Sequence, residues 1–432
     1  MSVEPDGPRW WRDPTCLAWL GVALAVRVAY AWNLHGLEAS DPMEYDAMAW
    51  NVAQGLGFTN RGFAVEESWV RRPPLFVFFV AAVYWIFGHS LFAARLAQCV
   101  LGTMLCAVTI ALGAAVAPMR TVRRVAAVAA LYPYLVYYSG YLMSETLATL
   151  LFTSVLWVLA RREPDLRSSA GAGALLGLAS LTRSSYLGFA GPLLFWLRDA
   201  RGAWRPAMRC FATLVAAALL VIAPWLVRNY AVTGMVIPIQ STGVWGFYEY
   251  HLWFSQDDFP TFDFTREDQS WREFEGRNRQ LFQKLKTIPP VEQDAYFRKA
   301  ALDYVLEDPR RYLRSCFRKF IWLWRPSTRA RAGEAVIEDP AFWLSIAVYF
   351  AWLPLFLMGL WRLQSAQAGG RLLIWAVVYV TALHTFYWYG APRFRFPIYP
   401  LLLIACCVAL ERWPLTEFRG RSVAVDTSRT PR

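Results

Sequence analysis

Residues 40–46 of the chain read SDPMEYD, and residues 71–76 read RRPPLF. The first stretch carries three acids, the second begins with a pair of arginines, and both lie between apolar segments. Charge beside a lipid bilayer is costly and is retained where it serves a function. This polar region is therefore the first place in the chain where we look for chemistry.

The composition indicates repeated membrane-spanning helices. Of 432 residues, 56% are hydrophobic and 18% are charged, which is less charge than the roughly 25% of soluble domains. The net charge of +12 comes from arginines in short clusters at the ends of apolar segments. That arrangement follows the positive-inside rule and differs from the continuous basic face of a nucleic-acid-binding protein. We expect an all-α polytopic membrane protein without a nucleic-acid partner.

Ten apolar segments predict a bundle of about ten transmembrane helices. Both termini and the arginine-rich connections after the second, fourth, sixth and eighth spans are then cytoplasmic. Gly171, Gly173 and Gly177 in the fifth span predict close helix packing. The predicted spans are residues 16–34, 90–117, 122–139, 141–160, 168–183, 184–197, 208–227, 341–361, 371–389 and 396–411.

The apolar run at 73–88 is not counted among the membrane spans. It is only about 16 residues long, and a crossing there would reverse the side of every later arginine cluster. We therefore predict a juxtamembrane or re-entrant helix on the outer face, with Pro73 and Pro74 at its start, where a missing N–H costs nothing.

Four regions follow from this topology. We expect a transmembrane catalytic module at 1–227 with its first outer loop at 35–89, a periplasmic domain at 228–340, C-terminal transmembrane helices at 341–411 and a cytoplasmic tail at 412–432. In the periplasmic domain, 265–286 and 291–320 have helical patterns, and Asp308-Pro309 marks a break.

Several charges fall on the outer side, where positive charge opposes the orientation signal. Arginine forks bind phosphate oxygens in pairs, so an outer-leaflet lipid phosphate is a candidate ligand. Each arginine could instead extend to lipid headgroups or pair with an acid. The outer arginines are Arg71, Arg72, Arg183, Arg228, Arg393 and Arg395.

Two further polar residues lie at the same level as these arginines. Glu145 is a candidate site residue, but it could equally cap the helix that begins there. His384 is a second candidate, and its alternative is a hydrogen-bonded core histidine.

The ordered motifs resemble those of one enzyme family. The chain resembles bacterial GT-C glycosyltransferases of the protein O-mannosyltransferase and aminoarabinose transferase (ArnT-like) superfamily, glycosyltransferase family 39. The matching pieces, in family order, are Asp41-x3-Tyr45-x3-Ala49, Gln54-Gly55-x-Gly57, Arg72-Pro73-Pro74-Leu75-Phe76, Phe87-Gly88-x-Ser90, Ala94-Arg95-Leu96, Ser144-Glu145-Thr146-Leu147, Gly177-Leu178-Ala179-x-Leu181-Thr182-Arg183, Pro224-Trp225-x2-Arg228-Asn229-Tyr230 and Arg393-Phe394-Arg395-Phe396-Pro397-x2-Pro400.

The resemblance implies a GT-C-type fold in the bacterial inner membrane and an active site facing the periplasm. It implies a polyprenyl-phosphate-linked sugar donor, an acceptor hydroxyl on a lipid, glycan or protein, and Asp41 as the general base. Many members have an Asp-Glu pair where this chain has Asp41-Pro42. Glu44, Tyr45 and Asp46 are therefore candidates for supporting the base or binding sugar.

Alternatives remain open. Asp41, Glu44 and Asp46 could supply oxygen ligands to a divalent metal, although acids in one loop are more often solvated or paired with arginine. The aromatic residues of the periplasmic domain could stack on sugars or form an interfacial belt; they are Trp245, Tyr248, Tyr250 and Trp253.

The protein could also have a function other than glycosyl transfer. A flippase for lipid-linked sugars and a non-enzymatic membrane scaffold are the rival functions. The sequence shows no inverted repeat of the kind that transporters carry.

Overall fold

The computed structural model describes residues 9–37, 41–60, 72–240, 243–261, 267–286, 290–325, 340–364 and 368–411. Within these ranges every regular element is a helix. The predicted cytoplasmic tail and Arg71 lie outside them. The predicted all-α class is therefore confirmed for the part of the chain that is described.

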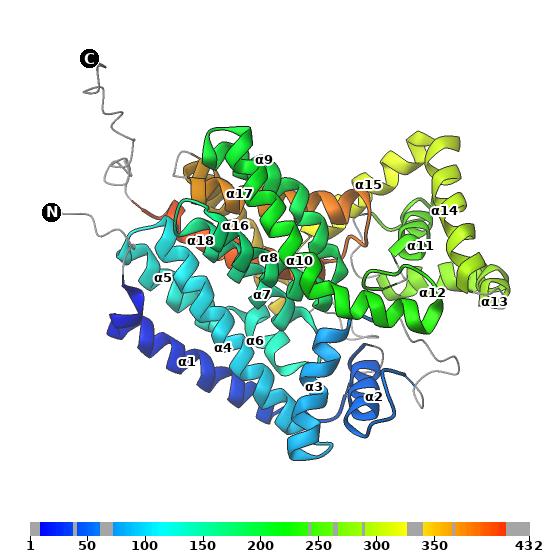
Figure 1. The fold of residues 1–432 in the computed structure, drawn as a ribbon, viewed down its shortest axis with the longest axis horizontal. Helices are drawn as coiled ribbons and strands as arrows, with labels where there is room; N and C mark the ends of the chain where they lie inside the picture. Colours follow the sequence, from blue (N-terminus) through cyan, green and yellow to red (C-terminus); the bar gives the residue numbers. More distant parts are fainter. Residues whose placement is uncertain are drawn as a thin grey trace.

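Two groups of helices make up the molecule (Figure 1). The bundle contains α1 (Pro14–Trp32), α4 (Leu91–Val116), α5 (Met119–Leu131), α6 (Pro133–Gly140), α7 (Glu145–Ala160), α8 (Leu166–Thr182), α9 (Ala190–Arg201), α10 (Trp204–Thr233), α16 (Pro340–Gln364), α17 (Ala368–Phe386) and α18 (Tyr399–Ala409). The other helices are α2 (Asp41–Ala53), α3 (Pro74–Phe87), α11 (Gly243–Phe254), α12 (Glu267–Arg277), α13 (Arg279–Lys286), α14 (Pro290–Glu307) and α15 (Pro309–Trp324). Short 3-10 turns are η1 (Trp10–Arg12), η2 (Ser184–Phe189) and η5 (Pro392–Ile398).

Among the described residues, five helical segments are long and apolar enough to cross a membrane: Pro14–Trp32, Leu91–Val116, Trp204–Thr233, Ala368–Phe386 and Pro392–Ala409. Two predicted spans were wrong as continuous helices. Residues 122–139 divide at Pro133, which removes a backbone donor and clashes with the preceding turn. Residues 184–197 divide into η2 and the first part of α9.

The break at Pro133 is stabilised by a charge inside the bundle. Arg27, in the middle of α1, is fully buried. Its guanidinium donates to the carbonyl oxygens of Ala23 at 2.9 Å, Ala130 at 3.1 Å and Ala129 at 3.4 Å. The last two carbonyls belong to the end of α5, where backbone acceptors have no helical partner. Arg27 therefore satisfies the polar groups that the break would leave unpaired in an apolar environment.

Helices α8 and α10 pack backbone to backbone. A Cβ atom on Gly173 would overlap the carbonyl oxygen of Leu214, and one on Gly177 would lie 2.8 Å from the carbonyl oxygen of Ala218. Around Gly171 the space is open. The predicted close packing is thus confirmed at two of the three glycines, and small residues permit it because they let the helix axes approach.

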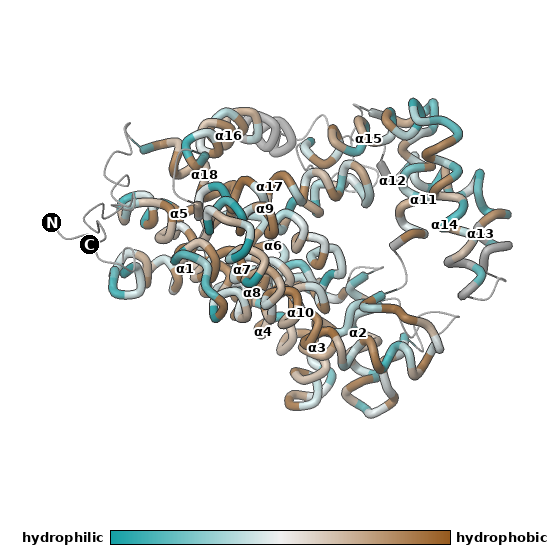
Figure 2. The backbone as a smooth tube through the Cα atoms, turned by 45° about the horizontal axis from the view of Figure 1, so that its top comes forward, coloured by the Kyte–Doolittle hydropathy of each residue, from teal (hydrophilic) through white to brown (hydrophobic). Residues whose placement is uncertain are grey.

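Helices α2, α3 and α11–α15 lie at one end of the bundle (Figure 1). We call them the outer helices because the sequence predicts them on the outer face. Figures 1 and 2 show α2 and the group α11–α14 at the same end. In Figure 2, α3 and α10 have strongly apolar stretches, whereas polar and apolar residues alternate along α14. The predicted break at Asp308-Pro309 is confirmed, since the Asp308 side chain caps α15 by accepting from the Arg311 N–H at 3.0 Å.

A buried polar cluster attaches α15 and α11 to the end of α17. The Ser315 hydroxyl donates to the Tyr312 carbonyl, so its oxygen accepts from His251 Nδ1 at 2.6 Å. His251 Nε2 then accepts from the Lys319 ammonium at 2.7 Å, and the Tyr312 hydroxyl donates to the Phe386 carbonyl at 2.9 Å. These contacts fix the outer helices relative to the chain that follows α17.

The glycine geometry gives a test of the fold. Gly173→Ala places a methyl group against the backbone of α10, and we expect a lower unfolding temperature because the helices must separate. Gly171→Ala, in the same helix, faces open space and gains helix propensity of up to about 1 kcal/mol. Thermal unfolding of both variants in detergent measures the difference. Equal unfolding temperatures would contradict the close contact.

Candidate active site

The stretch 41–53, which the sequence analysis placed in a loop, forms helix α2. Acids in its first turn, Asp41 and Glu44, suit the positive end of the helix dipole, and Pro42 has a dihedral angle that suits a helix start. Tyr45 and Met48 are buried on one face, and the Tyr45 ring packs edge-on against Phe76 of α3 at 4.9 Å. Packing against α3 therefore determines which way the two acids point.

Arg72 joins both acids of this first turn. Its Nη2 lies 2.5 Å from Asp41 Oδ1 and 2.5 Å from Glu44 Oε2, and its Nε donates to the same Glu44 oxygen at 2.8 Å. The guanidinium also lies over the Tyr45 ring at 5.1 Å. Arg72 stands directly before Pro73 and α3, so one arginine connects the starts of two outer helices.

The second oxygen of Asp41 is held from the far end of the chain. Arg393 of η5 donates from Nη2 to Asp41 Oδ2 at 2.8 Å. The Nε of Arg393 lies 3.4 Å from Glu145 Oε1, which in turn lies 2.9 Å from Nη1 of Arg183. Three carboxylates and three guanidinium groups thus alternate in the order Glu44, Arg72, Asp41, Arg393, Glu145 and Arg183, hereafter the charge chain.

The members of the charge chain differ in exposure. Side chains of Glu44 and Glu145 are 4% and 1% exposed, whereas Asp41 is 18% and Arg393 36% exposed. The two buried acids therefore hold the arginines from behind. Asp41 and Arg393 are more exposed to solvent than these two acids.

Electrostatics favour an ionised Asp41. Burial alone would raise the pKa of its carboxyl, but the charges of Arg393 and Arg72 and their hydrogen bonds outweigh it and hold the pKa below its ordinary value. Asp41 is therefore a carboxylate at neutral pH, with both oxygens engaged.

Asp46 lies elsewhere. It accepts from the Tyr84 hydroxyl at 2.5 Å and contacts His89 Nε2 at 2.9 Å, and His89 stacks on Trp50 at 4.7 Å. The sequence analysis did not identify His89, because its contact with Asp46 arises only when α2 packs beside the turn between α3 and α4. Asp46 thus anchors α2 instead of joining Asp41.

These placements bear on the metal suggested for Asp41, Glu44 and Asp46. The first two acids are bound to Arg72, and Asp46 is bound to Tyr84 and His89. Across the described ranges, no three His, Cys, Asp or Glu side chains gather where they could share a metal ion. The donor set does not fit a divalent cation, and no step below depends on one.

Other predicted residues fall into separate places. Arg228 lies over the rings of Trp225 and Phe58 at 4.7 and 5.5 Å. Arg395 is 2% exposed and donates to the Arg325 carbonyl at 2.9 Å, at the end of α15. Neither joins the charge chain, which contains the other three described arginines of the predicted set, Arg72, Arg183 and Arg393.

His384 and Tyr45 flank the charge chain. His384 is buried, hydrogen-bonds through Nδ1 to the Tyr389 carbonyl at 2.9 Å and stacks on Phe394 at 4.8 Å. The guanidinium groups of Arg183 and Arg393 lie over the Phe394 ring, each 5.2 Å from its centroid. The Tyr45 hydroxyl donates to Ser144 Oγ at 3.4 Å, next to Glu145. Both residues therefore support the charged groups from the side.

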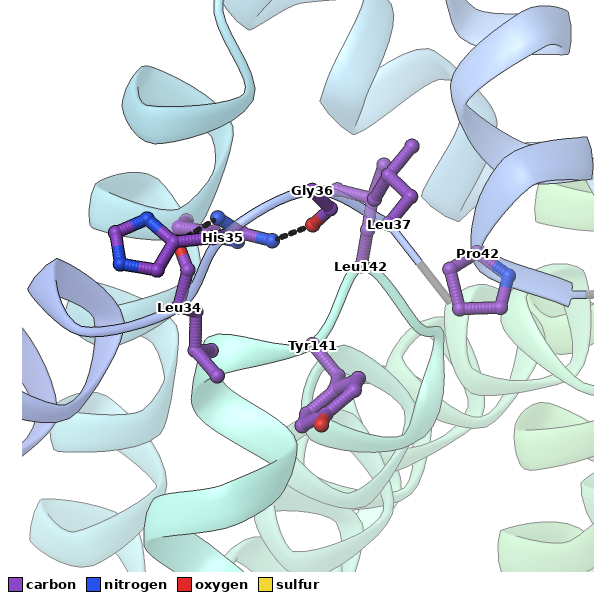
Figure 3. Close-up of a pocket in the computed structure, with 8 residues that line it drawn as sticks. Leu34, His35, Gly36, Leu37, Pro42, Tyr141 and Leu142 are labelled. Carbon is purple, nitrogen blue, oxygen red and sulfur yellow. Dashed lines mark hydrogen bonds between the residues drawn. The ribbon is translucent and has the colours of Figure 1, made fainter. Parts of the chain in front are cut away.

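A small pocket of about 140 Å³ lies below the first turn of α2 (Figure 3). Its lining residues are Leu34, His35, Gly36, Leu37, Pro42, Arg95, Tyr141 and Leu142. Arg95 of α4 donates to the carbonyl oxygens of Leu34, at 2.8 Å, and Gly36. These bonds hold the backbone of residues 34–36, just after α1, against α4.

The fold is similar to that of solved membrane-protein structures. The structure is similar to ArnT from Cupriavidus metallidurans bound to undecaprenyl phosphate, with a TM-score of 0.53 and 15% identity over 92% of this chain and 60% of that one. It is also similar to the archaeal oligosaccharyltransferase AglB from Archaeoglobus fulgidus in complex with an inhibitory peptide and a dolichol-phosphate, with a TM-score of 0.55 and 14% identity over 93% of this chain and 50% of that one. Both are GT-C glycosyltransferases, and the expected GT-C fold is confirmed.

The likeness is one of fold. This chain spans half to 60% of the length of the two proteins. A further structure of the Archaeoglobus fulgidus oligosaccharyltransferase, in complex with Zn and sulfate, gives a TM-score of 0.54 at 14% identity, with 91% of this chain and 48% of that one covered. No protein-family model and no curated protein sequence matches the chain.

The charge chain predicts how Asp41 titrates. A water-soluble carbodiimide reacts with protonated carboxyls, so the pH midpoint of Asp41 labelling, followed by peptide mass spectrometry, reports its pKa. Arg393→Gln removes one of the two opposing charges, and we expect the midpoint to rise by about one pH unit or more. Arg395→Gln, two residues away and outside the charge chain, serves as the control. A shift of the same size in both variants would contradict the assignment.

Proposed function

We propose that this chain is an integral-membrane inverting glycosyltransferase. It moves a sugar from a polyprenyl-phosphate-linked donor to an acceptor hydroxyl on a lipid, glycan or protein. The proposed location is the bacterial inner membrane, with the site facing the periplasm. The observation that supports this proposal is the position of Asp41 at the outer end of the bundle. Its partly exposed carboxylate is held between two arginines. A base beside phosphate-binding groups is what such a transfer requires.

The reaction balances with these groups alone. The acceptor oxygen forms a bond to the anomeric carbon while the bond from that carbon to the phosphate oxygen breaks. The acceptor proton passes to Asp41, and the electron pair of the broken bond remains on the lipid phosphate. A single displacement of this kind inverts the anomeric configuration, and it needs one carboxylate as general base.

Arginine side chains stabilise the leaving phosphate. Its negative charge grows as the sugar departs, so guanidinium groups at this point lower the energy of the transition state more than that of the bound donor. Arg393 and Arg72 both pair with Asp41, and Arg183 shares Glu145 with Arg393. The buried carboxylates Glu44 and Glu145 keep these forks oriented when phosphate binds.

The geometry also couples the two substrates. Without donor, both oxygens of Asp41 are engaged by guanidinium groups and are poorly placed to take a proton. A phosphate that binds Arg72 and Arg393 competes with Asp41 for the same N–H groups. Donor binding therefore frees the base, and sugar transfer follows donor binding in an ordered way. This order limits the access of the base to acceptor hydroxyls until a donor is present.

The role of the base can be tested by substitution. Asp41→Asn keeps the size of the side chain but removes its basicity, and we expect transfer from a panel of radiolabelled undecaprenyl-phosphate sugars to fall by about 10²- to 10⁴-fold. Asp257→Asn, at an exposed carboxylate that pairs with Arg314 outside the charge chain, serves as the control. Full transfer by Asp41→Asn would exclude Asp41 as the base. Movement of labelled donor across vesicles with no transfer by the unaltered protein would favour the flippase.

The proposed competition between the donor phosphate and Asp41 for the arginines can be measured directly. If undecaprenyl phosphate removes arginine contacts from Asp41 and adds a negative neighbour, the pKa of Asp41 rises. We expect the pH midpoint of carbodiimide labelling at Asp41 to move upward when undecaprenyl phosphate is added. Undecaprenol, which lacks the phosphate, is the matched control and leaves the midpoint unchanged. The same shift with both lipids would refute competition for the arginines.

A further inference from the structure

Tyr250 of α11 lies beside the charge chain. Burial, the Glu249 carboxylate and the charges of Arg393, Asp41 and Arg72 all act on its hydroxyl, and burial dominates in raising the pKa to about 12. Ring contacts connect Tyr250 to Arg393: Tyr250 stacks on Tyr389, Tyr389 packs on Phe394, and Arg393 lies over Phe394.

Two neighbours extend this ring into a surface. Tyr389 stacks on Tyr250 with centroids 4.6 Å apart and planes 18° apart, and Trp388 meets Tyr250 edge-on at 5.7 Å. Gly246, one turn earlier in α11, lets Trp388 lie against the helix backbone, since a Cβ there would be 2.7 Å from the indole. All three aromatic side chains remain partly exposed. We call Tyr250, Trp388 and Tyr389 the aromatic wall.

The aromatic wall continues directly to the arginines. Tyr389 packs edge-on against Phe394 at 5.6 Å, and Phe394 lies under the guanidinium groups of Arg393 and Arg183. Apolar ring faces and charged forks therefore adjoin each other at one place. Among the described residues, no hydrogen bond occupies the Tyr250 hydroxyl, which is free to bind a polar ligand.

Other aromatic residues of α11 do not share this position. Trp245 and Tyr248 both face Phe297 of α14, and Trp253 is fully buried among other rings. These residues belong to the core of the outer domain. Of the four aromatics in α11 that the sequence marked as possible sugar-stacking residues, Tyr250 is the one connected through Tyr389 to Phe394, beside Arg393.

We propose that the aromatic wall binds a pyranose ring of the acceptor, so that the acceptor is a carbohydrate or carries one; this inference rests on the proposed transferase function. The C–H face of a pyranose is apolar and packs on aromatic rings, while its hydroxyls need hydrogen-bonding groups at the edge. The Tyr250 hydroxyl and Glu249 supply such groups. The wall is formed by α11 and by the chain that follows α17.

Direct binding tests this assignment. The protein in lipid nanodiscs would be studied by saturation-transfer difference NMR with methyl glycosides of glucose, galactose, mannose and N-acetylglucosamine, and with a serine-containing hexapeptide. We expect at least one glycoside to receive saturation through its ring C–H protons. Tyr250→Leu and Trp388→Leu weaken that binding by at least about five-fold, and Tyr250→Phe weakens it less because the ring remains.

Two controls make the outcomes decisive. Tyr296→Leu, in α14, removes an exposed tyrosine outside the wall and leaves glycoside binding unchanged, while circular dichroism and undecaprenyl phosphate binding show that every variant is folded. Saturation of the peptide alone, or of no probe, overturns the carbohydrate assignment, and so does binding that the wall variants retain. A competition experiment gives a further outcome that overturns the assignment. If an undecaprenyl-phosphate sugar displaces the glycoside but undecaprenyl phosphate does not, the wall binds the sugar of the donor. Failure of undecaprenyl phosphate to bind the unaltered protein counts against the transferase function itself.

Discussion

The double ion pair of Asp41 with Arg72 and Arg393 is the contact on which the outer end of the bundle depends. It joins α2, the start of α3 and η5, and Glu145 extends it to α7 and to Arg183 after α8. Charges removed from water require partners, and truncating one partner leaves another charge uncompensated at a cost of about 3–5 kcal/mol when the pair is buried. The equal number of acids and arginines in this chain of contacts therefore serves structure as well as chemistry.

In the proposed transferase, the same arrangement would let one site serve two substrates. An arginine that holds a carboxylate in the free protein can hold a phosphate in the complex, since both ligands present paired oxygens to the guanidinium fork. The buried acids behind the arginines keep the forks in place during this exchange. The aromatic wall adjoins the arginines through Phe394, so that an acceptor sugar on the wall would lie beside the phosphate of the donor.

Periodicity and charge predicted the helical class, a short apolar helix at α3 and the break at Asp308-Pro309, because each depends on local apolar length, proline chemistry or capping. The sequence did not reveal that 41–53 is helical. Its apolar face is short and is stabilised by contact with α3, which lies twenty residues later in the chain. Nor did it reveal that Asp46 turns toward His89, since that contact requires α2 and the start of α4 to lie together.

By itself the sequence determined the inventory: apolar helices, an outer segment rich in acids, and arginines on the side where they oppose the orientation signal. Tertiary structure decided which of these charges meet. Arg393 and Arg395 are two residues apart, yet one binds Asp41 and the other caps α15. A 3-10 turn has three residues per turn, so positions two apart point in different directions, and ion pairs act only over a few ångströms. No local pattern encodes which helix lies within that distance.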